Sequence, residues 1–188
     1  MSTVAGRITS RPRVGLAGAL LVGAAVAAAL GVYARAHTPS GRPLFTLGFS
    51  SMLQMKAWLT TVALAFILVQ LATALWMWRR LPGTGPAPRW VSVLHRWSGA
   101  TAFVITLPVA FHCIWALGFA TTSARVIAHG VAGCVFYGAY AAKMLGLRLR
   151  SVPGWALPAL GGSVFGLFVL VWLTAALWFF TSSGFPLT

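Results

Sequence analysis

The sequence predicts an all-α fold, an integral membrane helical bundle of about five transmembrane helices. Of its 188 residues, 59% are hydrophobic and 7% are charged, and the mean hydropathy is +0.87. All fourteen charges are Lys or Arg, and long apolar intervals separate most of them. A helix crosses a bilayer with about 20 apolar residues, so intervals of this length indicate membrane spans. The +14 charge therefore does not indicate a nucleic-acid partner, because a soluble binding domain is not this apolar.

Five intervals are long enough to span a bilayer, and they cover residues 14–34, 56–78, 91–118, 124–146 and 156–181. Each is expected to be helical, because backbone amides in lipid must find hydrogen-bond partners within their own segment. Most of the tryptophans lie near an interval end, where amphipathic rings reach the headgroups. Pro/Gly-rich stretches separate the second interval from the third and the fourth from the fifth. We expect one membrane domain over residues 1–188.

The basic residues also predict an orientation, because Lys and Arg near span ends are retained in the cytoplasm. The N-terminus and the second and fourth loops hold ten of them: Arg7, Arg11, Arg13, Arg79, Arg80, Arg89, Arg96, Lys143, Arg148 and Arg150. The opposite side holds four: Arg35, Arg42, Lys56 and Arg125. We therefore expect the N-terminus in the cytoplasm and, after five spans, the C-terminus outside.

The first interval has two interpretations. Basic residues, an apolar stretch and Ala34-Arg35-Ala36 resemble a cleavable signal peptide, although the stretch is long for one. Small residues recur every four positions at Gly15, Ala19, Gly23, Ala27 and Gly31. Such a stripe lets another helix approach closely. We favour a retained packing helix.

The absence of Asp and Glu excludes several classes of enzyme site. Carboxylate acid/base pairs, Ser-His-Asp triads and carboxylate-bound Mg²⁺ or Ca²⁺ all need a residue that the chain lacks. We see no independent catalytic residues, and an enzymatic role remains open only as a subunit of a membrane oxidoreductase. Cys113 and Cys134 lie inside predicted spans, where they are interpreted as structural thiols.

His112 and His129 are the most informative residues, because an ionisable group inside a span indicates function. They lie at similar depth toward the outer ends of the third and fourth spans, which a short loop makes antiparallel neighbours. Two such imidazoles suit the axial positions of a b-type haem. Gly133 leaves room for a flat ring, and Arg125 is placed to bind a propionate. The alternatives are a structural hydrogen bond between the histidines and another metal.

Two weaker sites remain open. His95 begins the third span on the inner side, and Met144 is the nearest candidate for a second axial ligand, so a second haem is one interpretation. The other is that His95 belongs to an interfacial cluster that binds lipid headgroups. In the first outer loop, His37 lies near Met52 and Met55, a group able to hold Cu(I). We interpret these methionines mainly as an apolar helix face.

Several runs of the sequence carry a resemblance to a known family. They are Leu94-His95-Arg96-Trp97-Ser98-Gly99, residues 107–113, Ala128-His129-Gly130, residues 133–143 and residues 171–180. With these runs the chain resembles an actinobacterial family of small multi-span membrane proteins of unknown function, over nearly all the chain after residue 50. Members are often encoded near Rieske-type iron–sulfur proteins, so the resemblance implies a possible redox partner.

In plan, the chain is also similar to small b-type membrane cytochromes and ferric reductases, in which four helices hold haem between paired histidines. Only His112 and His129 match such a pair well, and the inner side offers His95 alone. We therefore expect an electron-transfer subunit that holds one haem b near the outer face and exchanges electrons with a quinone or a partner protein. A cofactor-free scaffold subunit is the main alternative, and metal handling, copper included, is the third.

Overall fold

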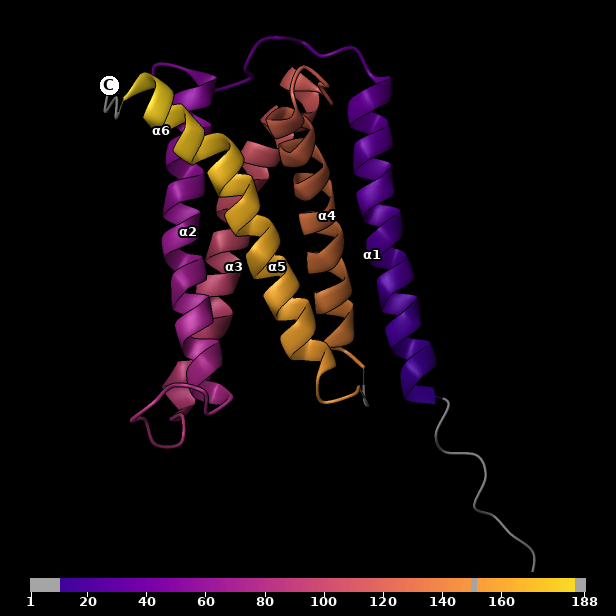
Figure 1. Cartoon of the computed structure of the whole chain (residues 1–188), viewed down its shortest axis with the longest axis vertical. Coiled ribbons are helices and arrows are strands. Elements are labelled where there is room, and N and C mark those ends of the chain that lie inside the picture. Colours follow the sequence, from indigo (N-terminus) through magenta and orange to yellow (C-terminus); the bar gives the residue numbers. More distant parts are fainter. Residues whose placement is uncertain (1–10, 150–151, 185–188) are drawn as a thin grey trace, which may run out of the picture.

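The computed structural model describes residues 11–149 and 152–184, and within these ranges the chain is helical with connecting loops and no strand. The elements in order are α1 (Arg11–Ala36), α2 (Met52–Met77), α3 (Arg89–Phe111), η1 (His112–Leu117), α4 (Ala124–Gly146), α5 (Ala156–Trp172), η2 (Leu173–Leu177) and α6 (Trp178–Ser183). The segments η1 and η2 are π-helical and continue α3 and α5 without a break (Figure 1). The predicted all-α fold is confirmed.

Among the described residues, four helical segments are long and apolar enough to cross a membrane: Val14–Ala36, Met52–Met77, Arg89–Leu117 and Ala156–Ser183. Their ends lie within four residues of the predicted spans. The remaining predicted span, the fourth in the chain, is α4, which has the expected bounds but is more polar, because Arg125, His129 and Lys143 all lie on it. Helices α1 and α5 both pack along α4, so this polar helix lies inside the bundle (Figure 1).

Helix α1 packs on α4 through the small residues that the sequence singled out. A Cβ added at Gly23 would meet the carbonyl oxygen of Gly138, and one added at Gly138 would lie 2.9 Å from Ala27 Cβ. The two backbones are therefore in contact, as a small-residue stripe permits. The predicted packing role of the first span is confirmed.

The third and fourth spans are antiparallel, as expected, but α3 is not packed closely along α4. Aromatic side chains bridge the two helices: Phe103 stacks on Tyr140 at 4.1 Å between ring centroids, and the Tyr137 hydroxyl donates to Thr106 O at 3.0 Å. The closest partner of α3 is α2 instead. Large rings thus hold α3 away from α4, and the space between them widens into a cavity toward one end.

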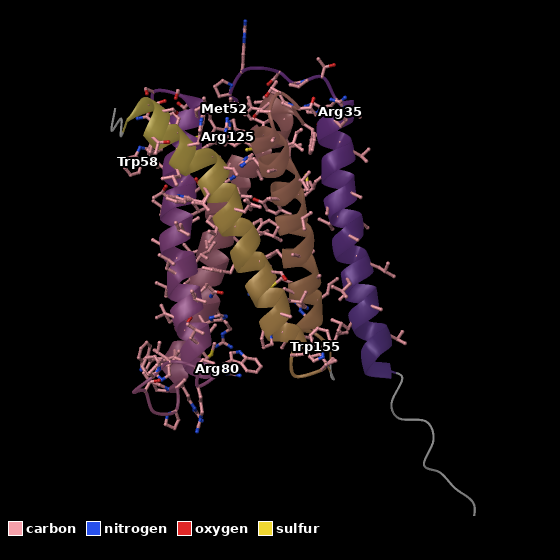
Figure 2. The ribbon with its side chains drawn as sticks, in the orientation of Figure 1. Arg35, Met52, Trp58, Arg80, Arg125 and Trp155 are labelled. Carbon is pink, nitrogen blue, oxygen red and sulfur yellow. The ribbon has the colours of Figure 1, made fainter. Side chains whose placement is uncertain are left out.

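The two ends of the bundle differ in charge. Figure 2 shows Arg80 and Trp155 at one end, and Arg35, Met52 and Arg125 at the other. The end with Arg80 also holds the first residues of α1 and the loops after α2 and α4, as the basic-residue pattern requires. Of the ten basic residues predicted there, Arg7 and Arg150 lie outside the described residues.

At the opposite end, the loop between α1 and α2 covers η1. The amides of Ser40 and Gly41 donate to Trp115 O and Ala116 O at 3.3 and 3.0 Å. Gly118 ends η1 with a φ of +65°, and an added Cβ would lie 2.7 Å from Pro39 Cγ, so both conformation and space require glycine there. These contacts hold the loop between α1 and α2 against η1.

Candidate functional site

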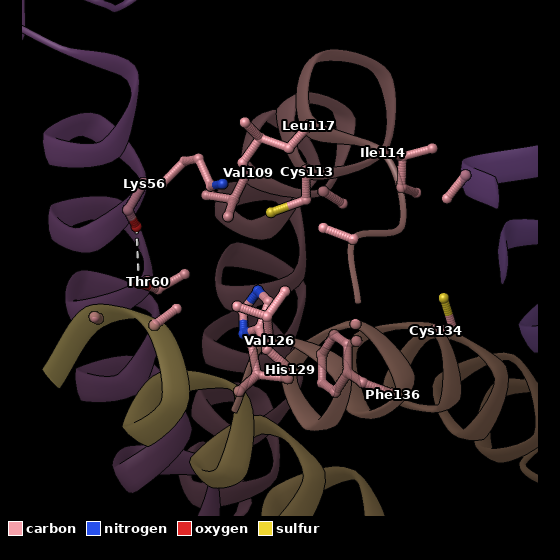
Figure 3. A pocket seen from close by; sticks show the side chains of 18 of the residues that line it. Lys56, Thr60, Val109, Cys113, Ile114, Leu117, Val126, His129, Cys134 and Phe136 are labelled. Carbon is pink, nitrogen blue, oxygen red and sulfur yellow. Dashed lines mark hydrogen bonds between the residues drawn. The ribbon is translucent and has the colours of Figure 1, made fainter. Parts of the chain in front are cut away.

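A cavity of about 380 Å³ lies between α1, α2, α3–η1, α4 and α5–η2–α6, near the end of the bundle that η1 occupies (Figure 3). Its lining is mostly apolar, with Leu, Val, Ala, Ile and Phe side chains from all of these elements. The residues of the lining that carry polar or sulfur groups are Lys56, Thr60, Thr106, Cys113, Thr122, Arg125, His129, Cys134, Tyr137 and Trp178. Apolar cavities of this size with a few convergent polar groups are typical of ligand sites.

Both π-helical segments border this cavity: η1 contributes Cys113, Ile114 and Leu117, and η2 contributes Ala175 and Ala176. A π-helix is wider than an α-helix and is found mostly as a short bulge, frequently at a functional site. Within the part of the chain that the structure describes, η1 and η2 are the π-helical segments. Their meeting at one cavity makes this cavity the candidate functional site.

Lys56 lies on the second turn of α2 and is 8% exposed, with its side chain directed into the cavity (Figure 3). A buried ammonium group is costly unless an anion pairs with it. The chain contains no Asp or Glu, so no carboxylate side chain is available as that anion. The thiol group of Cys113 borders the same cavity as the Lys56 ammonium (Figure 3).

His129 lines the same cavity and has a defined tautomer. The Thr174 hydroxyl donates to Leu170 O at 2.7 Å, so it accepts, rather than donates, in its 3.2 Å contact with His129 Nδ1. Nδ1 therefore carries the ring proton, and Nε2 is left with a free lone pair. Cys113 borders the same cavity as this ring, and Nε2 is the ring nitrogen able to accept a proton from the thiol.

Arg125, one turn before His129, also faces the cavity but has protein partners. Its Nη1 donates to Thr174 O at 2.6 Å, and its guanidinium group lies 3.9 Å from the centroid of the Trp178 ring. These contacts tie α4 to η2 and leave several guanidinium N–H donors for another acceptor. Gly133 lines the cavity as well, and an added Cβ there would meet no atom within 4 Å. The predicted positions of Arg125, His129 and Gly133 thus converge.

His112 is not among the residues that line the cavity. It is fully buried, its Nδ1 donates to Pro108 O at 2.7 Å, and Phe45 packs edge-on against its ring at 4.6 Å. Its Nε2 has no hydrogen-bond partner. The structure therefore brings His112 and His129 to the same end of the bundle without directing both imidazoles into one space.

The structure also does not bring together His95 and Met144, the candidate ligands of a second haem on the inner side. His95 Nδ1 lies 2.9 Å from the Thr73 hydroxyl on α2, and His95 O accepts from Gln70 Nε2. Met144 is 41% exposed on the surface of α4. His95 serves the packing of α3 against α2, and Met144 faces outward.

His37, the predicted copper residue, stacks on Tyr33 and directs its two ring nitrogens at Tyr33 O and Trp115 O, at 3.1 and 3.0 Å. Met55, the nearest predicted partner on α2, is fully buried. Within residues 11–149 and 152–184 there is no cluster of three or more His, Cys, Asp or Glu side chains that would hold a metal ion.

Sequence reasoning missed Lys56, Cys113 and Thr174 as site residues. Lys56 had a visible signal, because it is the lone charge in an apolar span of 26 residues. Cys113 had none, since its partners come from α2 and α4. Thr174 is identified only by its contacts with Arg125 and His129.

The helical spans and the cavity between them define a multi-pass membrane protein. The chain belongs to a family of unknown function (DUF6529), whose profile matches residues 16–187. The predicted resemblance to a family of multi-span membrane proteins of unknown function is thus confirmed at this level. No curated protein and no solved structure matches the chain.

Proposed function

We propose that this protein binds an anionic amphiphile, a molecule with an apolar body and an acidic head, in the cavity beside Lys56. The buried ammonium group of Lys56 carries the proposal, because it faces an apolar cavity in a chain without carboxylates. A phosphate or carboxylate head would supply the missing counter-charge. The apolar walls would accept the body of the ligand.

Two cationic side chains are available to bind one acidic head group. Lys56 on α2 and Arg125 on α4 line the same cavity from different elements. Arg125 retains free N–H donors beside its bond to Thr174 O, and the planar guanidinium suits phosphate and carboxylate oxygens. The distribution of basic residues predicts that the cavity end of the bundle faces outward, and we propose this orientation. An acidic lipid of the outer half of the bilayer is the ligand class that meets these requirements.

We expect Lys56→Met to reduce the acidic lipid that stays bound during purification in a mild neutral detergent. A charge-assisted hydrogen bond contributes about 1.5–3 kcal/mol, which corresponds to retention weakened by roughly tenfold or more. Native mass spectrometry of the full chain, with extraction and identification of bound lipid, measures this. Lys143→Met is the matched control, since Lys143 is partly buried on α4 outside the cavity, and it should retain the lipid. Equal retention in both variants, or no bound lipid in the parent protein, would contradict the proposal and favour a ligand-free scaffold subunit.

A b-type haem is a second candidate, and haem is itself an amphipathic anion. One observation favours it: the Nδ1 contacts of His112 and His129 leave Nε2 as the unprotonated nitrogen in each ring, the form that binds iron. His129 would be the ligand from the cavity, Arg125 and Lys56 would hold propionates, and Gly133 would face the ring. When bound, the haem would supply one-electron chemistry, with a quinone or a Rieske-type protein as the partner that the sequence suggested.

The position of His112 opposes this candidate, because that side chain must turn toward the cavity before it can share an iron with His129. An absorption spectrum of the detergent-purified protein, expressed with haem supply and then reduced with dithionite, decides between the candidates. We expect a colourless protein with bound acidic lipid. A sharp α-band that is lost in His129→Ala would establish the cytochrome instead.

A further inference from the structure

Cys113 is positioned in the cavity by the π-helical turn that begins at His112. Two side chains from other helices, Lys56 on α2 and His129 on α4, line the cavity together with this thiol. Figure 3 shows the Lys56 side chain, the Cys113 sulfur and the His129 ring around the same space. Cys134, the other cysteine of the lining, lies apart from this group in the same view.

The arrangement is that of an activated nucleophile. A thiol becomes a strong nucleophile when a base takes its proton and a third group orients the base. His129 is the base, because its Nε2 lone pair is free to accept, and Thr174 Oγ1 fixes the ring by accepting from Nδ1 at 3.2 Å. Lys56 places a positive charge beside the sulfur and stabilises the negative charge that forms there as the proton leaves.

The cavity also determines which part of a bound lipid can reach the Cys113 thiol. A lipid whose acidic head contacts Lys56 and Arg125 carries its acyl ester carbonyls next to the head group. These carbonyls would therefore lie close to Cys113, which lines the same cavity. A carbonyl carbon of this kind is an electrophile that a thiol–imidazole pair attacks.

We propose that Cys113 is a nucleophile that takes the acyl group of an anionic glycerolipid ester and forms a thioester; this rests on the lipid binding proposed above. The sulfur attacks the ester carbonyl while His129 takes the thiol proton. The carbon–oxygen bond of the ester breaks, and the leaving alkoxide receives that proton from His129. The products are acyl-Cys113 and a lysolipid with a free hydroxyl group, so atoms and protons balance and no oxidant is needed.

The test incubates the full-length protein with phosphatidylglycerol vesicles whose acyl chains are deuterated. Intact-protein mass spectrometry should show the mass of one deuterated acyl chain on a fraction of the molecules, removed by neutral hydroxylamine and mapped to Cys113. Cys113→Ala should abolish the adduct, and the matched variant Cys134→Ala should keep it. His129→Gln should lower the rate about 100-fold, the scale of a lost general base.

Thr174 is a positioning residue in this scheme and gives a second measurement. Thr174→Val should slow acylation without removing bound lipid, and Thr174→Ser should restore the rate. Each variant is first checked for a monodisperse elution profile and a parent-like melting curve. An adduct that survives in Cys113→Ala, or bound lipid with no adduct on any cysteine, would overturn this inference and leave lipid binding intact. Absence of bound lipid in the parent protein would overturn both.

Discussion

Gly23→Leu is expected to separate α1 from α4 and to lower the melting temperature more than any other single substitution considered. A Cβ at Gly23 would lie 2.9 Å from Ala142 Cβ and against the backbone carbonyl of Gly138. A backbone carbonyl in a helix cannot turn aside as a flexible side chain does, so the helices must move apart. Overpacking of this kind costs about 3 kcal/mol, and here the loss of the whole small-residue contact adds to it.

The matched control is Gly18→Leu on the same helix. Gly18 is exposed, and an added Cβ there would meet no atom within 4 Å. The two variants make the same change in side chain and in helix propensity, so their difference reports packing on α4 alone. Melting followed by intrinsic tryptophan fluorescence in detergent, with size-exclusion chromatography, gives the comparison. Equal melting temperatures for the two variants would show that α1 does not pack on α4 through this stripe.

The fold was predictable where it depends on local sequence. Apolar intervals gave the spans to within four residues, because the length needed to cross a bilayer is fixed. The stripe at Gly23 and its neighbours gave the packing face of α1. The arrangement of the helices relative to one another was harder to predict from the sequence. The short loop after η1 indicates that α3 and α4 are antiparallel, but the distance between them depends on rings such as Phe103 and Tyr140, which meet only in three dimensions.

The site was predictable in part for the same reason. His129, Arg125 and Gly133 lie on one helix, and their spacing of four residues places them on one face. His112 was placed by the same helical arithmetic, but η1 begins at that residue and a π-turn changes the angular position of side chains. Cys113, the next residue, lines the cavity in its place. The roles of Lys56 and Thr174 depend on contacts between helices, which a single sequence does not display.

His112→Leu is expected to leave the protein as stable as the parent or more stable, and to leave lipid binding unchanged. The ring is fully buried, and its Nε2 lone pair has no partner. Burial of an unpaired polar atom costs about 1–3 kcal/mol, which offsets the roughly 1 kcal/mol supplied by the bond from Nδ1 to Pro108 O. Leucine removes both the unpaired nitrogen and the hydrogen bond, and it fills a similar volume beside Phe45.

His129→Leu is the matched comparison, because His129 Nδ1 contacts the Thr174 hydroxyl and the ring faces the cavity, where its Nε2 is not enclosed by packed side chains. This variant should melt below the parent, since it leaves buried polar partners without their contacts. Melting curves and bound-lipid content are measured for both variants side by side. Together they show whether each histidine contributes to helix packing or to ligand binding. If His112→Leu instead loses a bound ligand or a visible absorption band while remaining folded, its Nε2 is a ligand to that group. His112 and His129 would then act together, as the spacing of the two histidines first suggested.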